Sequence, residues 1–69
     1  SVLSIVVGAG VDDEEAARLA NIAPVDVAVS VIRVVPGSAR RRRKITRGVI
    51  IDCPSLEDLP MLVSRGVNA

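Results

Sequence analysis

The sequence contains no aromatic residue and no histidine, and its only cysteine is Cys53. Without histidine, a Cys–His catalytic pair and a histidine-ligated metal site are excluded, and one cysteine cannot form a disulfide within the chain. Without Phe, Tyr or Trp, no ring is present on which a nucleic-acid base could stack. These absences favour a non-enzymatic protein with no catalytic residue, no metal and no small-molecule cofactor.

The hydrophobic core has to be built from aliphatic residues alone. The chain has 69 residues, of which 49% are hydrophobic, and this length corresponds to one small domain over residues 1–69. Aromatic residues bury the most area per residue, so a monomer of this size without them is only marginally stable. We therefore expect the domain to form a homo-oligomer.

Long apolar runs are also missing. No segment approaches the roughly 20 apolar residues that a membrane-spanning helix needs. The apolar opening, Val2–Val7, lacks the basic leader and the cleavage site of a signal peptide. The sequence predicts no membrane contact, and the cytoplasm is the expected location.

Hydrophobic periodicity and end signals predict the first half of the fold. Residues 2–7 are apolar on both alternating faces, which is typical of a central buried strand. Asp12, with Glu15 three residues later, is expected to cap a helix that ends at Pro24. Residues 25–35 alternate as a second strand, and a slip near residues 31–32 indicates a bulge or a change of face.

The second half of the chain completes a β-α-β-β-α order. Residues 45–52 are the predicted third strand, and their local connection to the second strand favours an antiparallel hairpin. Pro60 conflicts with a helix starting at Ser55, so we expect a turn over residues 55–58 and a short helix over residues 59–65 that stops at Gly66.

The predicted fold class is therefore α/β, a small two-layer sandwich resembling half of a ferredoxin-like or KH-like domain. Its antiparallel hairpin would carry both helices on one face of the sheet. The valine-rich second strand is the expected site of pairing between copies.

Charge is strongly segregated along the chain, although the net charge is only +1. Residues 1–32 carry a net charge of −4, residues 33–47 carry +7 and residues 48–69 carry −2. A partner responds to this local field rather than to the average. The predicted binding residues are the cations of the middle segment: Arg33, Arg40, Arg41, Arg42, Arg43, Lys44 and Arg47.

Most of these cations fall in the expected loop between the second and third strands. Guanidinium groups match phosphate oxygens with paired hydrogen bonds, and release of counterions drives such association. The leading hypothesis is a binding module whose loop contacts nucleic-acid phosphates or an acidic protein surface, with salt-sensitive affinity and no recognition of bases. In one alternative, a self-assembling protein docks this loop on the acidic helix start, residues 12–15, of a neighbouring copy. In another, the cations stay solvated or pair with the chain's own acids there.

Several segments follow the order found in potato inhibitor I-type protease inhibitors: Gly8, the helix from Asp12, residues 24–27, residues 34–38 and residues 47–52. The resemblance implies that Ser38–Lys44 is a protease-binding loop and that the target is a serine protease cleaving after a basic residue. The chain departs from this family in lacking an aromatic residue near its start, and residues 61–66 replace the usual closing Pro-x-Val-Gly.

Overall fold

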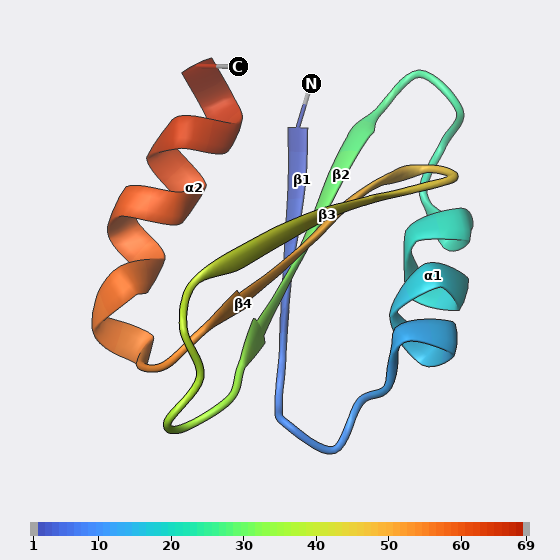
Figure 1. Ribbon diagram of the computed structural model, residues 1–69. Coiled ribbons are helices and arrows are strands. Elements are labelled where there is room, and N and C mark those ends of the chain that lie inside the picture. Colours follow the sequence, from blue (N-terminus) through green and yellow to red (C-terminus); the bar gives the residue numbers. More distant parts are fainter. Residues whose placement is uncertain (1, 69) are drawn as a thin grey trace.

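The computed structural model describes the backbone of residues 2–68 and the side chains of residues 2–65. It is a small α/β fold with one mixed sheet of four strands in the order β1-β2-β4-β3 (Figure 1). β1, β2 and β4 run parallel, and β3 is antiparallel to β4. In chain order the elements are β1 (Val2–Val7), α1 (Asp13–Ile22), β2 (Ala28–Val34), β3 (Arg41–Ile45), β4 (Gly48–Cys53), a short 3-10 helix (Leu56–Asp58) and α2 (Leu59–Asn68).

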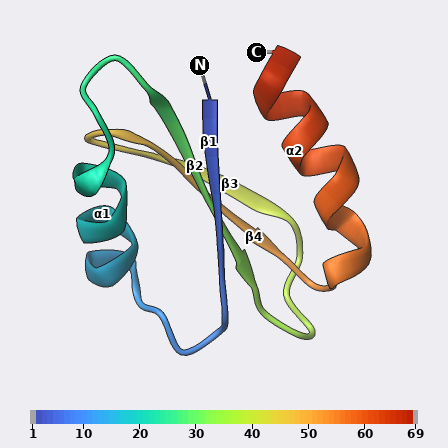
Figure 2. The same cartoon turned by 180° about the vertical axis from the view of Figure 1, so that it is seen from behind.

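The two helices cover opposite faces of the sheet, as both views show (Figures 1 and 2). On one face, Ala16 of α1 packs with Val31 and Ile50. On the other, Leu62 of α2 packs with Ile32 and the fully buried Cys53. The expected two-layer sandwich with both helices on one face is therefore wrong, because the central strands are apolar on both sides and each side needs a cover.

The central strand is β2, and its burial on both faces explains its irregular alternation. Val31 and Ile32 are neighbours in sequence, yet both are fully buried, one beneath each helix. The register of β2 against β1 and β4 runs without interruption. The prediction of a bulge or a change of face near residues 31–32 is therefore wrong, since Val31 and Ile32 alternate as in a regular strand. With a neighbour on each side, β2 also has no open edge for pairing between copies.

The sheet is bounded by β1 and β3. β1 was expected to be a central strand but lies at an edge, where Leu3 and Val6 are exposed. Its apolar character on both faces fits this edge position because α1 and α2 each pack near it, leaving only some of its side chains in solvent.

The arginine-rich run is a strand rather than a loop. Arg41–Ile45 forms β3, which joins β4 through a two-residue turn at Thr46 and Arg47. The antiparallel hairpin is therefore β3–β4, whereas β2 and β4, the predicted second and third strands, run parallel. A charged strand is tolerated at this position because an edge strand exposes much of its side-chain surface. The resulting β-α-β-β-β-α order differs from the half ferredoxin-like or KH-like pattern.

The ends of the helices follow the local signals in most places. Asp12 accepts a hydrogen bond from the backbone N–H of Glu15 at 2.9 Å, and α1 ends before Pro24, as predicted. The turn at residues 55–58 is confirmed as the 3-10 helix, capped by Ser55. The stop at Gly66 is wrong, since α2 continues to Asn68; one glycine within a helix costs only about 1 kcal/mol. No helix in residues 2–68 is both long and apolar enough to cross a membrane.

Gly48 closes the β3–β4 hairpin in a backbone conformation that other residues rarely adopt. Its φ is +116°, and an added Cβ would lie 2.1 Å from the backbone oxygen of Val29 on β2. We expect Gly48→Ala to lower the free energy of unfolding by about 3 kcal/mol or more, because β4 must separate from β2. Gly10→Ala is the control, since nothing lies within 4 Å of its added Cβ. Equal urea midpoints for the two variants would contradict this account of the hairpin.

Candidate anion-binding site

Arg33 is held inside the molecule rather than presented to a ligand. Its side chain is only 12% exposed, and Nε and Nη2 donate to the two carboxylate oxygens of Asp52 at 2.9 and 3.2 Å. Nη1 donates to the carbonyl of Val11 at 2.7 Å, and Nη2 lies 3.0 Å from Asp13 Oδ1. The register of β2 and β4 places Arg33 directly opposite Asp52. Arg33 therefore ties these two strands to the start of α1.

Arg43 completes a network with the same two carboxylates. Its guanidinium donates to both oxygens of Asp13, at 2.9 Å for Nη2 and Oδ1, and lies 3.8 Å from Asp52 Oδ2. The ion-pair network, which we define as Asp13, Arg33, Asp52 and Arg43, links α1 to β2, β3 and β4. The hydrogen bonds and charge of Arg43, assisted by Arg33, hold the pKa of the Asp13 carboxyl well below its usual range.

The same hydrogen bonds raise the pKa values of the two arginines of the network. The bonds to Asp52 and Asp13 raise the pKa of Arg33, and the bonds to Asp13 and the charge of Asp52 raise the pKa of Arg43. Both guanidiniums stay charged, as required for ion pairs that join separate strands.

Arg47 is also engaged within the chain. Its guanidinium donates to the carbonyls of Ala23, Pro24 and Val27, which follow the last turn of α1. A cation next to a helix C-terminus interacts favourably with the helix dipole and with unpaired carbonyls. Arg47 thus fixes the β3–β4 turn against the end of α1.

The other four predicted residues lie along β3 and the residue before it. Their side chains are exposed, and no ion pair among the described residues involves them. They are Arg40, Arg41, Arg42 and Lys44, and we call them the exposed cations. Alternation along β3 places Arg41, Arg43 and Ile45 on the face of the sheet toward α1, whereas Arg42 and Lys44 flank Val49 on the opposite face.

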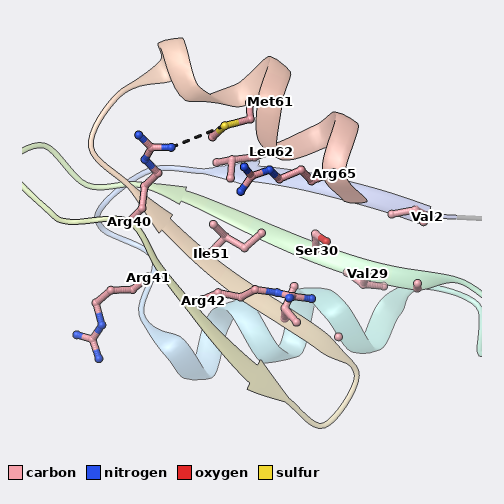
Figure 3. Close-up of a pocket in the computed structure, with 13 residues that line it drawn as sticks. Val2, Val29, Ser30, Arg40, Arg41, Arg42, Ile51, Met61, Leu62 and Arg65 are labelled. Atoms are coloured by element: carbon pink, nitrogen blue, oxygen red, sulfur yellow. Dashed lines mark hydrogen bonds between the residues drawn. The ribbon is translucent and has the colours of Figure 1, made fainter. Parts of the chain in front are cut away.

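A groove of about 370 Å³ lies on the α2 face, between α2 and the β3–β4 hairpin (Figure 3). It exists because α2 packs against β1, the edge farthest from β3. Its floor includes Ser30, Val49 and Ile51. Among the residues whose side chains the structure describes, every charged residue that lines it is an arginine: Arg40, Arg41, Arg42 and Arg65. The guanidinium of Arg41 points away from the groove (Figure 3).

Arg40 and Arg65 give this groove its positive walls. Arg40 extends toward α2, where its Nη1 lies 3.7 Å from Met61 Sδ (Figure 3). Arg65 comes from α2 and was not among the residues predicted from sequence. A single arginine in a short helix carries no functional signal of its own, although its i, i+4 spacing from Met61 places both on one helix face.

Comparison of the chain with protein-family models, curated proteins and solved structures found no significant match. The resemblance to potato inhibitor I-type inhibitors therefore rests on the sequence segments alone. Of the proposed reactive loop, residues 41–44 belong to β3 and pair with β4, and only residues 38–40 lie outside a strand.

Because Arg33 is buried in the ion-pair network and the exposed cations are not, substitutions at the two kinds of position should affect stability differently. Arg33→Gln should lower the free energy of unfolding by about 2–4 kcal/mol, because the buried Asp52 loses its principal partner. Arg41→Gln removes the same charge from an exposed position and should change stability by less than about 0.5 kcal/mol. Chemical denaturation measures both. Similar losses for the two variants would contradict a structural role that is special to Arg33.

The lowered pKa of Asp13 predicts a loss of stability in acid. Its contribution is fully present above the unfolded-state pKa of about 3.9 and is lost as pH falls toward the lower folded-state pKa. Unfolding free energies measured between about pH 2 and pH 7 should therefore decline more steeply below about pH 4 in the wild type than in Asp13→Asn. Asp26→Asn, which removes an exposed carboxylate outside the ion-pair network, controls for net charge. Identical curves for Asp13→Asn and the wild type would contradict the prediction.

Proposed function

We propose that this chain is a non-enzymatic binding module that contacts nucleic-acid phosphates through β3. The observation that carries the proposal is the row of exposed cations at a sheet edge, without carboxylate partners among the described residues. Neighbouring like charges repel one another. The fold neutralises Arg33 and Arg43 but gives the exposed cations no carboxylate among the described residues. Their mutual repulsion therefore remains, and phosphates bound along this edge of the sheet would relieve it.

Several observations favour an external anion over the acidic helix start of a second copy. Asp12 accepts the capping hydrogen bond of α1, and Asp13 belongs to the ion-pair network. Glu14 and Glu15 both contact Arg18 on the next turn of the same helix. Each of the four acids therefore has a partner within the chain, so self-docking would first have to displace existing contacts.

The salt dependence of DNA binding tests this proposal. Engagement of all four exposed cations corresponds to a slope of about −3 to −4 in log K against log salt concentration. Fluorescence anisotropy of a labelled oligonucleotide should reveal binding at low salt that weakens with this slope. Absence of binding at low salt, or affinity that does not depend on salt, would overturn the proposal.

A variant with Arg41, Arg42 and Lys44 all changed to Gln should reduce the magnitude of the slope by about 2–3. Its affinity at low salt should fall at least about tenfold, while its unfolding midpoint stays close to that of the wild type. Arg18→Gln removes an exposed cation from α1 and should preserve most of the affinity. Polyglutamate added as a competitor distinguishes nucleic acid from an acidic protein as the partner. If the natural partner is an acidic protein, polyglutamate should displace the oligonucleotide efficiently.

A further inference from the structure

The groove beside β3 offers more than positive charge (Figure 3). Val49 and Ile51 of β4 and Ala28 of β2 give it an apolar floor, and Met61 and Leu62 supply the wall on α2. A surface that only contacted phosphates would not need such a floor, because phosphates are bound through charge and hydrogen bonds. Apolar surface enclosed by arginines instead matches a ligand that joins an anionic group to an uncharged, flat or apolar part.

Ser30 adds a hydrogen-bonding group to this floor. The residue is 8% exposed and lines the groove. None of the side-chain hydrogen bonds within the described residues involves its hydroxyl. No buried side-chain oxygen of the described residues lacks a partner, so the Ser30 hydroxyl is reached by solvent at the groove, where it can both donate and accept a hydrogen bond. The groove therefore contains a hydrogen-bonding group that the protein itself leaves available.

The arginines also supply flat surfaces. Arg42 enters from β3 and Arg65 from α2, so guanidinium groups approach the groove from two walls. A guanidinium plane can stack on a nucleic-acid base, as an aromatic ring does. The lack of Phe, Tyr and Trp therefore does not exclude base stacking here. No carboxylate within residues 2–65 lines the groove, so its field favours an anionic ligand.

We propose that this groove takes one unpaired base of a single-stranded nucleic acid while the adjoining phosphates lie on the exposed cations. The base would contact Val49 and Ile51, and its edge would bond to Ser30. The volume of about 370 Å³ is at the lower end of the roughly 300–1,000 Å³ typical of ligand sites. This inference rests on the proposed function and narrows it to single strands, because bases in a duplex are already stacked and paired.

The decisive comparison uses two labelled strands with the same number of phosphates, an oligothymidylate and a matching strand of abasic sites. At about 100 mM salt the intact strand should bind the wild-type chain about tenfold more tightly than the abasic strand. Equal affinities with a normal salt slope would overturn the base-binding groove and leave the proposed function standing. Absence of salt-dependent binding to either strand would overturn both.

Two variants test whether the preference for the intact over the abasic oligonucleotide arises in the groove. Ala28 is exposed at the start of β2 and lines the groove, so Ala28→Leu should fill it and bring the ratio of the two affinities close to one. Ser30→Ala keeps the space, removes only the hydroxyl and should reduce the ratio several-fold. Circular dichroism checks that each variant is folded.

Lys44→Gln is the matched control because Lys44 lies on β3 outside this groove. This variant should weaken the binding of the intact and the abasic oligonucleotide by the same factor, so the ratio of the two affinities should not change. A ratio that survives in Ala28→Leu and Ser30→Ala would overturn the assignment of the base to this groove.

Discussion

The ion-pair network of Asp13, Arg33, Asp52 and Arg43 determines which charges of this protein remain available to a ligand. It connects the start of α1 to β2, β3 and β4 through hydrogen bonds between charged groups. Such bonds are the stronger kind, and here they join segments that are far apart in sequence. The segregation of acidic and basic segments along the chain is therefore partly a structural device, because the fold brings opposite charges together.

The same network sets the orientation of β3. With Arg43 turned toward Asp13, the alternation of a strand turns Arg42 and Lys44 to the opposite face. The local charge of +7 in residues 33–47 consequently overstates the field that a ligand meets. Arg33, Arg43 and Arg47 serve the fold, and the groove gains one cation from outside this segment, Arg65.

The groove follows from the small size of the core. A sheet of four strands is about 14 Å wide between its outer strand axes, whereas a helix with its side chains is about 10–12 Å across. One helix on each face cannot cover all four strands. On the first face, the small residues Ala16 and Ala20 let α1 approach closely, and Ile45 of β3 joins the core. On the second, α2 packs against β1, so the apolar residues of β4 beside β3 stay accessible.

Sequence reasoning succeeded where the determining contacts are local. The cap at Asp12, the helix end before Pro24 and the turn at Ser55 each depend on residues within one turn of the chain. It failed on the sheet, because the tendency of a segment to form a strand depends strongly on the neighbour it pairs with. The arginine run has weak strand propensity of its own and becomes β3 because β4 offers it an edge.

The site was predictable only in part, for the same reason. Clustered cations identified the segment, and pairing with the chain's own acids at residues 12–15 was one of the alternatives that the sequence left open. Which cations form those pairs depends on the sheet order, which places Arg33 opposite Asp52 and brings Arg43 to Asp13. The contribution of Arg65 and the exposure of Ser30 to the groove depend on where α2 packs, and no local pattern encodes that position.

Protection of a sheet edge is a competing explanation for the charges on β3, since charged side chains discourage edge strands from pairing. The opposite edge argues against it as the main reason. β1 contains no charged residue and leaves Leu3 and Val6 exposed, so this sheet does not protect its edges by a general rule. The charges on β3 also extend beyond the strand to Arg40, which points across the groove to Met61. Edge protection requires no cation there, and none on α2, whereas binding of an anion in the groove accounts for both Arg40 and Arg65.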